Sequence, residues 1–257
     1  MTRRKGAVVA FSGVDCAGKS TQLQLLEGAL SRRGHVVRVC WFRPGYGPEL
    51  DALRRRLRRA KRGVLPQPGP SAERERAFQR PGVSELWLLV ACLDALLQLA
   101  IKVRFWSLRG EVVICDRYLE DALIDLELRF PAQMARAHGV VRRVLRACPR
   151  PDAHFLLMLD EAAQRERMAA KQEPFPDAEP VRAARRARYD AWAEAARGGS
   201  AQVSVPNGVS CAPDRAAPPS RAPGAQAVVL DGAAAPGVIH ARLWSWLTRA
   251  GVVDARA

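Results

Sequence analysis

The sequence is poor in aromatic and acidic residues and contains no closely paired cysteines. Aromatic residues make up 6% of the 257 positions, and Lys and Arg outnumber Asp and Glu by 41 to 26, for a net charge of +15. The six cysteines are widely spaced and form no C-x-x-C pair. That pattern favours reduced, mostly buried thiols, so we expect a cytoplasmic protein. The apolar stretch after residues 1–5 is short and ends at Gly13, which does not match a secretory signal peptide.

The sequence also lacks an uninterrupted apolar run long enough to cross a membrane. Its most apolar segment, from Leu86 to Val103, is short for a membrane span and contains Asp94, Gln98 and Lys102. Charges near the centre of a bilayer are costly. We therefore interpret this segment as a helix buried on most faces, in a core or a dimer interface, and expect no membrane association.

The excess of basic residues has two interpretations. A nucleic-acid-binding protein would use such a surface to contact phosphates, whereas an enzyme could gather some arginines around a polyphosphate substrate. The positive charge is spread along the chain, and its densest run, residues 54–62, contains no aromatic residue. Nucleic acid is therefore not expected as the principal partner.

Strand-like and helical patterns alternate along the chain. Short apolar runs rich in β-branched residues predict strands at residues 7–11, 35–42, 111–115, 154–159 and 227–230. Apolar periodicity and boundary residues predict helices at 19–32, 49–61, 84–108, 131–147, 161–170, 181–197 and 237–250. This order is typical of a doubly wound α/β fold with a mostly parallel sheet, which binds ligands at the carboxyl ends of its strands. Residues 198–225 are rich in Gly, Ser, Pro and Ala, and a flexible insertion is expected there.

One segment matches the G-x-x-x-x-G-K-[ST] pattern of a phosphate-binding P-loop, between a predicted strand and a predicted helix. With the next residue it comprises Gly13, Val14, Asp15, Cys16, Ala17, Gly18, Lys19, Ser20 and Thr21. The glycines let the backbone turn its N–H groups toward phosphate oxygens, and the helix adds its positive end. Lys19 would reach the β- and γ-phosphates of ATP, and Ser20 would coordinate Mg²⁺. A chance match in a turn is the alternative, which the strand and helix context disfavours.

A second group of candidates follows the strand predicted at residues 111–115. Asp116 comes directly after this strand, where a carboxylate beside a P-loop could hold Mg²⁺ through water or bind an acceptor group. Arg117 could bind an anionic substrate through two hydrogen bonds. The alternative is a structural ion pair between these residues or their neighbours. The presence of the P-loop favours the functional interpretation.

Basic residues also gather on the two helices predicted on either side of residues 172–180. A mobile basic flap over ATP would stabilise the charge that develops on the transferred phosphoryl group. A solvated helix face is the alternative, and it accounts for most of these residues. We favour Arg165 and Arg167 as the ones that act in catalysis.

These motifs together resemble those of thymidylate kinases and related nucleoside monophosphate kinases. The resemblance runs from Val9 to about Leu247, and its most specific part is the stretch from Gly110 to Tyr118. It also rests on residues 11–15 and 18–22, Pro44-Gly45, and residues 151–152, 159–160 and 230–231. The resemblance implies a five-stranded parallel sheet flanked by helices, in a single P-loop kinase domain over residues 1–257. It further implies a basic lid at about residues 161–182 and often a homodimer, with the long apolar helix at its interface.

The resemblance assigns roles to three acidic or basic side chains. Asp15 matches the P-loop carboxylate that would approach the sugar hydroxyl of the acceptor. Asp116 and Arg117 match a pair that would lie near Mg²⁺ and the acceptor phosphate. Some members carry a catalytic arginine directly after the P-loop carboxylate, where this chain has Cys16. That charge would then come from the lid.

The acceptor half of the pattern is altered. In many members the long helix carries an Asp-Arg pair whose arginine holds the acceptor phosphate, and this chain has Asp94-Ala95 there. Where many members have Arg-Glu-Pro-Gly, it has Phe42-Arg43-Pro44-Gly45. Arg43 could supply a charge on the acceptor side or could simply lie on the surface.

The function expected from these motifs is in-line transfer of the γ-phosphoryl group of Mg-ATP to dTMP or a related nucleoside monophosphate. The protein would contribute mainly positioning and charge neutralisation. One alternative is a kinase of the same fold that acts on a nucleoside or another small acceptor, which Ala95 favours. The other is a regulatory module that binds ATP without turnover, which the presence of Lys19, Ser20 and Asp116 disfavours.

Overall fold

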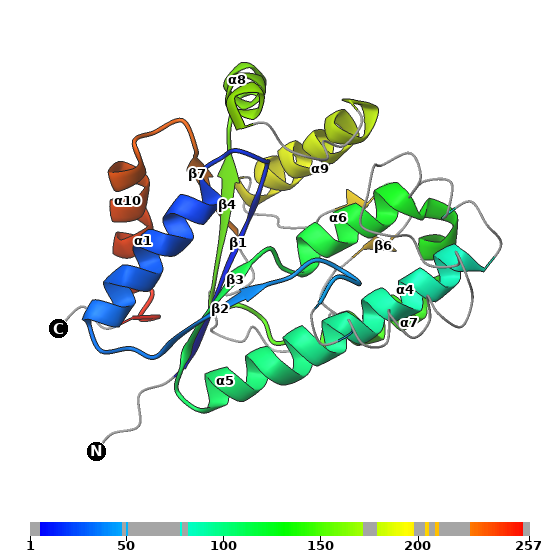
Figure 1. Ribbon diagram of the computed structural model, residues 1–257, viewed down its shortest axis with the longest axis horizontal. Helices are drawn as coiled ribbons and strands as arrows, with labels where there is room; N and C mark the ends of the chain where they lie inside the picture. The colour runs from blue at the N-terminus through cyan, green and yellow to red at the C-terminus, as the bar shows by residue number, and fades with distance from the viewer. Residues whose placement is uncertain are drawn as a thin grey trace.

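Five parallel strands form the central sheet of the protein, in the order β2–β3–β1–β4–β7 (Figure 1). They are β1 (Ala7–Gly13), β2 (Val37–Trp41), β3 (Val112–Asp116), β4 (Ala153–Met158) and β7 (Ala227–Asp231). The computed structural model describes residues 6–47, 50, 78, 82–171, 179–197, 204–205, 209–210 and 227–253. The prediction of a five-stranded parallel sheet flanked by helices is confirmed.

Helices cover both faces of this sheet (Figure 1). One face carries α1 (Lys19–Arg32) and α10 (Pro236–Arg249). The other face carries α4 (Val83–Ala95), the π-helix η2 (Leu96–Val103), α5 (Arg104–Leu108), α6 (Leu119–Arg129) and α7 (Pro131–Ala147). Helix α9 (Glu179–Arg197) contacts β4, β7 and α6, and α8 (Glu161–Lys171) projects beyond the carboxyl end of β4.

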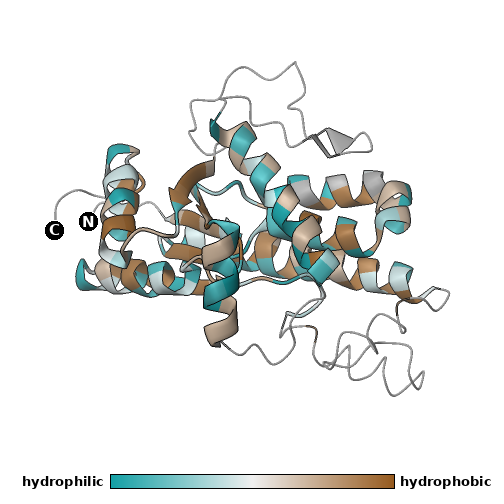
Figure 2. Cartoon of the chain, turned by 90° about the horizontal axis from the view of Figure 1, so that it is seen from above, coloured by the Kyte–Doolittle hydropathy of each residue, from teal (hydrophilic) through white to brown (hydrophobic). Residues whose placement is uncertain are grey.

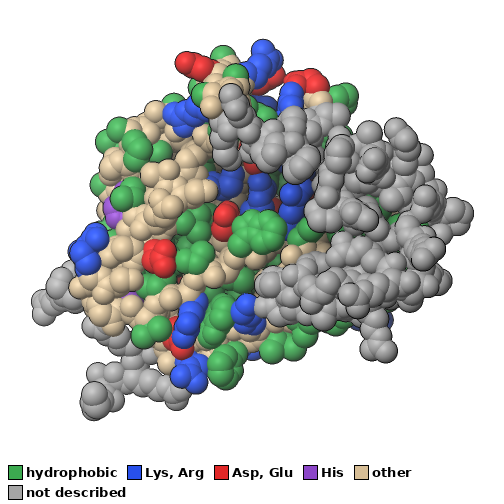
Figure 3. Space-filling model, in the orientation of Figure 1, with side chains coloured by type: hydrophobic (Ala, Val, Ile, Leu, Met, Phe, Trp, Pro, Cys, Tyr) green, Lys and Arg blue, Asp and Glu red, His purple; other side chains and the backbone are tan. Residues whose placement is uncertain are grey.

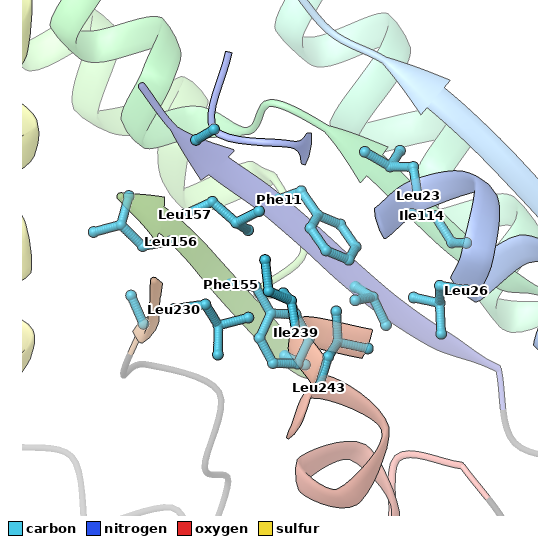
Figure 4. Packing of buried hydrophobic residues seen from close by; sticks show 14 of the residues in the cluster. Phe11, Leu23, Leu26, Ile114, Phe155, Leu156, Leu157, Leu230, Ile239 and Leu243 are labelled. Atoms are coloured by element: carbon cyan, nitrogen blue, oxygen red, sulfur yellow. The ribbon is translucent and has the colours of Figure 1, made fainter. Parts of the chain in front are cut away.

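Alternation of side chains along β1 divides the core into two layers. Val9 and Phe11 pack in the layer that contains α1 and α10, and Val8 and Ala10 pack in the layer under the long helix. Figure 4 shows Phe11 beside Phe155, with side chains of α1 and α10 around them. Hydrophobic residues lie mainly on the strands and on the helix faces turned toward them (Figure 2). Because both faces of the parallel sheet are covered, its central strands β1, β3 and β4 are buried and mostly apolar.

The long apolar helix predicted at residues 84–108 runs without a break from Val83 to Leu108, and its middle turns are wound as a π-helix. In the part of the chain that the structure describes, this is the one helix long and apolar enough to cross a membrane, with 56% of its most apolar window buried. Its buried side packs in the core layer that also contains α6 and α7.

Helix α6 was not among the predicted helices. Its leucines at positions 119, 123 and 126 have helical spacing, so a signal for it was present in the sequence. The helix predicted at 49–61 lies outside the described residues except for position 50. The expected flexible insertion at 198–225 also lies outside them, apart from the two-residue strands β5 (Ser204–Val205) and β6 (Val209–Ser210).

The carboxyl ends of the strands bring the predicted motifs together at one edge of the sheet. β1 ends in Gly13 at the start of the P-loop, and β3 ends in Asp116. In the strand register Asp116 lies beside Phe11 on one side and beside Trp41 on the other. In a doubly wound fold this edge is where ligands bind.

Candidate active site

The spacing of the P-loop glycines is required by the local backbone. Gly13 has φ of 129°, and a Cβ atom there would lie 2.0 Å from the carbonyl oxygen of Leu157 on β4. Gly18 has φ of 89° and begins α1. L-amino acids with a side chain rarely adopt these values, so glycine keeps the turn between β1 and α1 free of strain. Cys16, between them, takes a positive φ of 62° without being glycine.

Lys19 bridges the loop from the first turn of α1. Its ammonium donates hydrogen bonds to the carbonyl oxygens of Gly13 and Val14, at 2.9 and 2.7 Å. Burial, followed by the positive charge of Arg117, lowers the pKa of Lys19 to about 8. The lysine is therefore a desolvated cation that gains stability from any anion brought to the loop.

The P-loop opens onto a cavity of about 500 Å³ at the carboxyl edge of the sheet. Figure 3 shows Lys and Arg side chains gathered below α8, beside acidic and hydrophobic ones. The predicted site residues that line the cavity are Asp15, Cys16, Gly18, Lys19, Ser20, Thr21, Asp116, Arg117 and Arg167. Two further loop residues, Val14 and Ala17, have buried side chains. Trp41, 46% exposed, also lines the cavity, although no sequence motif marked it.

The Asp116–Arg117 turn is held against β1. Arg117 has a positive φ of 70°, and its backbone N–H donates to the carbonyl oxygen of Phe11 at 2.9 Å. Its guanidinium forms an ion pair with Asp15 across the cavity, with 2.8 Å between Nη2 and Oδ1. The structure therefore joins the two residues that the resemblance places near the acceptor.

The two carboxylates of the cavity have opposite pKa shifts. Burial raises the pKa of Asp116, and the nearby positive charges of Lys19 and Arg117 offset only part of that shift. For Asp15 the desolvation is outweighed by Arg117, Lys19 and Arg185, which together lower its pKa. The cationic neighbours of Asp15 thus stabilise its ionised form. The cationic neighbours of Asp116 do not fully compensate for its burial. A carboxylate in that state favours binding of a cation.

The structure separates Arg165 and Arg167, which the sequence grouped together. Arg167 donates hydrogen bonds to the carbonyl oxygens of Cys16 and Gly232, at 3.3 and 3.0 Å, and so joins α8 to the P-loop and to the end of β7. Arg165 forms an ion pair with Glu161 on its own helix, with 71% of its side chain exposed. Arg165 does not line the cavity described above.

The altered positions that the resemblance places on the acceptor side do not line the main cavity. The guanidinium of Arg43 lies 5.3 Å from the ring centroid of Tyr46 and does not line the main cavity. Ala95 is buried and lines a small apolar cavity of about 20 Å³ together with Phe42. The carboxylate of fully buried Asp94 accepts hydrogen bonds from the backbone of Gly47 and from Gln98. Asp94 thus fixes the segment after β2.

A buried polar cluster behind Arg117 was missed from the sequence. It comprises Ser12, Asp121 and Tyr189, which come from β1, α6 and α9. In the sequence, Asp121 lies in a bulky, acidic stretch directly after Tyr118. Because helix α6 was not predicted, nothing indicated that Asp121 would turn inward rather than face solvent.

Comparison with known proteins identifies relatives of a single kind. A thymidylate kinase of Leifsonia xyli subsp. xyli is 32% identical over 198 residues, which cover 74% of this chain and 81% of that protein. A thymidylate kinase of Clavibacter michiganensis subsp. michiganensis is 31% identical over 186 residues, covering 69% and 75%. The chain belongs to the thymidylate kinase family. It is therefore a kinase, and the resemblance inferred from its motifs is confirmed.

Solved thymidylate kinases share this fold. The structure from Candida albicans superposes with a TM-score of 0.57 at 13% identity, covering 95% of this chain and 92% of its own. The structure from Ehrlichia chaffeensis gives a TM-score of 0.50 at 15% identity, covering 95% and 98%. No family model matches the chain. Membership in the thymidylate kinase family thus rests on the sequence relatives, and the fold agrees with it.

Proposed function

We propose that this thymidylate kinase relative transfers the γ-phosphoryl group of Mg-ATP to a nucleoside monophosphate, dTMP or a related nucleotide. The observation that carries the proposal is that one cavity contains the P-loop, the desolvated Lys19, and the Asp15–Arg117 ion pair. Phosphoryl transfer needs mainly positioning and neutralisation of charge, and this constellation can supply both.

On the donor side, the P-loop backbone and Lys19 would hold the phosphates of ATP. In the described part of the chain no group of His, Cys, Asp and Glu could hold a metal ion through protein side chains alone. The Ser20 hydroxyl and Asp116 both line the cavity, and the raised pKa of Asp116 fits a place for a cation. Mg²⁺ would be held by these two groups together with phosphate oxygens, and it would neutralise charge on the phosphates.

On the acceptor side, Asp15 would accept a hydrogen bond from the sugar hydroxyl, and Arg117 would contact the acceptor phosphate. Arg167 would carry positive charge to the transferring group from α8. Within the basic lid proposed at about residues 161–182, it is the arginine whose contacts with the P-loop support that role. Arg165, exposed and paired with Glu161, would reach the phosphates only after a change of rotamer. Arg43 could approach an acceptor only from outside the main cavity.

The long helix supports a proposed homodimer of single-domain subunits spanning residues 1–257. Large hydrophobic side chains are exposed along it: Leu89, Leu93, Ile101, Phe105 and Leu108. Large apolar side chains exposed along one helix favour an interaction site there. We propose that a second copy covers this face rather than a lipid bilayer, in a cytoplasmic protein. Ile101→Asp should convert the dimer to a monomer in light scattering. Val238→Asp, which changes an exposed valine on α10 of the opposite face, should leave the mass unchanged.

The test of the function is ADP formation measured with dTMP, dUMP, other nucleoside monophosphates, nucleosides, and no acceptor. We expect turnover with dTMP or another monophosphate, with phosphate contacts supplied by Arg117. Turnover with nucleosides alone would contradict the proposal and would match the apolar surroundings of Ala95. ADP release without any acceptor would indicate a nucleotide-binding module instead.

A further inference from the structure

Asp121 is a buried carboxylate held from three directions. Its side chain is 2% exposed. One oxygen accepts hydrogen bonds from the hydroxyl of Ser12 and from the backbone N–H of Tyr118, the latter at 2.9 Å. The other accepts a hydrogen bond from the hydroxyl of Tyr189 at 2.5 Å. A buried carboxylate needs hydrogen bonds and a counter-charge to be tolerated.

The counter-charge is Arg117. Its Nη1 lies 3.6 Å from Oδ1 of Asp121 and 3.4 Å from the hydroxyl of Tyr189. The tyrosine hydroxyl thus donates to the carboxylate and accepts from the guanidinium, which closes a ring of three side chains. The opposite end of the guanidinium, Nη2, pairs with Asp15 at 2.8 Å. Each terminal nitrogen of the Arg117 guanidinium therefore has an acidic partner.

We propose that Asp121 is the positioning residue of Arg117, acting directly and through Tyr189. The inference rests on the proposed function only in that Arg117 would contact the acceptor. Asp15 lines the cavity and would also accept the sugar hydroxyl, so it would be shared between the arginine and the acceptor. Asp121 lies behind the arginine and is bound to β1, α6 and α9. A fixed anchor behind a mobile substrate site keeps the guanidinium in its reactive geometry.

A purely structural alternative is available, because the bond from the Tyr118 N–H to Asp121 also caps the start of α6. If Asp121 only capped α6, removal of its charge would lower the stability of the protein but would not change the order of the Arg117 guanidinium. A positioning carboxylate would affect the order of Arg117 and the use of the acceptor. The two roles therefore predict different measurements.

The experiment compares Asp121→Asn, Tyr189→Phe and the control Tyr118→Phe in the full chain. Asp121→Asn keeps the shape of the side chain and removes its charge. Tyr189→Phe removes only the hydroxyl between Asp121 and Arg117. Tyr118→Phe removes an equally buried hydroxyl, which bonds to the carbonyl oxygen of Pro149 away from the cavity. The readouts are hydrogen exchange of the Arg117 Nε–H by NMR, the kinetic constants for acceptor and ATP, and Tm.

We expect faster exchange of the Arg117 signal in both site variants. We also expect kcat/KM for the acceptor to fall by about 10²-fold in Asp121→Asn, with KM for ATP little changed. Tyr189→Phe should show the same pattern to a smaller degree, and Tyr118→Phe should match wild type in all but Tm. Unchanged exchange and kinetics in Tyr189→Phe would overturn the proposal, even where Asp121→Asn does not fold.

The experiment distinguishes failure of the proposed function from failure of the positioning role of Asp121. If wild-type protein phosphorylates no monophosphate, the acceptor assignment is wrong, and the exchange measurement on the free protein still decides whether Asp121 orders Arg117. If wild type is active and the Arg117 signal is as protected in both site variants as in wild type, the positioning role is wrong while the function stands.

Discussion

The side chain of Arg167 on α8 donates a hydrogen bond to the carbonyl oxygen of Cys16 in the P-loop, at 3.3 Å. The resemblance places a catalytic arginine at the position of Cys16 in some relatives. In this protein the guanidinium arrives at the same loop from a helix 151 residues further along the chain. We propose that Arg167 takes the place of that loop arginine in neutralising the transferred phosphoryl group.

Exchange of Arg167 for alanine should therefore reduce activity more than exchange of Arg165. Removal of one positive group that stabilises a transition state typically costs about 10²-fold or more in kcat. We expect a loss of that order for Arg167→Ala and a clearly smaller one for Arg165→Ala. Both arginines lie on α8, so the two variants change the charge of the helix equally. Equal losses in a steady-state assay would show that the lid rearranges before transfer.

Lys19→Ala should abolish turnover and leave folding nearly intact. The ammonium is desolvated, so its loss removes a buried charge together with two hydrogen bonds to backbone carbonyls. We expect kcat to fall by at least about 10²-fold with a small change in Tm. Lys102→Ala, which changes a lysine beside Trp106 on the opposite face of the sheet, is the control. Normal activity in Lys19→Ala would rule out the ATP site.

Binding of ATP should be accompanied by uptake of protons above about pH 8. The pKa of Lys19 in the free protein is lowered to about 8, so the side chain is largely neutral at about pH 9. Phosphates favour the charged form and raise that pKa on binding. A proton is therefore taken up, and the affinity for ATP should fall as the pH rises through 8. Calorimetry in buffers of different ionisation enthalpy measures the uptake, which Lys19→Ala should lack.

Gly13→Ala should destabilise the protein and damage the P-loop. The added methyl group would meet the carbonyl oxygen of Leu157, and φ of 129° is unfavourable for alanine. We expect a loss of more than about 1 kcal/mol in the free energy of unfolding. Gly139→Ala is the matched control, since this glycine lies in α7 with open space around it and alanine favours helix. Denaturant titration measures the free energy of unfolding of both variants. Equal values would contradict the prediction and would show that the P-loop relaxes around the added methyl group.

Much of the fold was predictable because its signals are local. The bounds of α1 and α7 agree with the predicted ranges, since the apolar spacing and the boundary residues lie within each segment. The strands were located by short apolar runs, and their parallel arrangement followed from alternation with helices. Helix α6 was not predicted, although its leucines have helical spacing, because it is short and directly follows the motif at the end of β3.

The sequence by itself determined that this protein has a P-loop between a strand and a helix, and it predicted that Lys19, Ser20 and Asp116 lie at one edge of the sheet. Each of these conclusions depends on a short motif whose own residues are neighbours along the chain. Only the tertiary structure decided that Arg117 lies between Asp15 and Asp121, and that Arg167 rather than Arg165 reaches the loop. Arg117 and Asp15 are 102 residues apart, and Ser12 and Asp121 are 109 apart. Such contacts follow from the order of strands in the sheet and from the packing of helices against it, which no local pattern records.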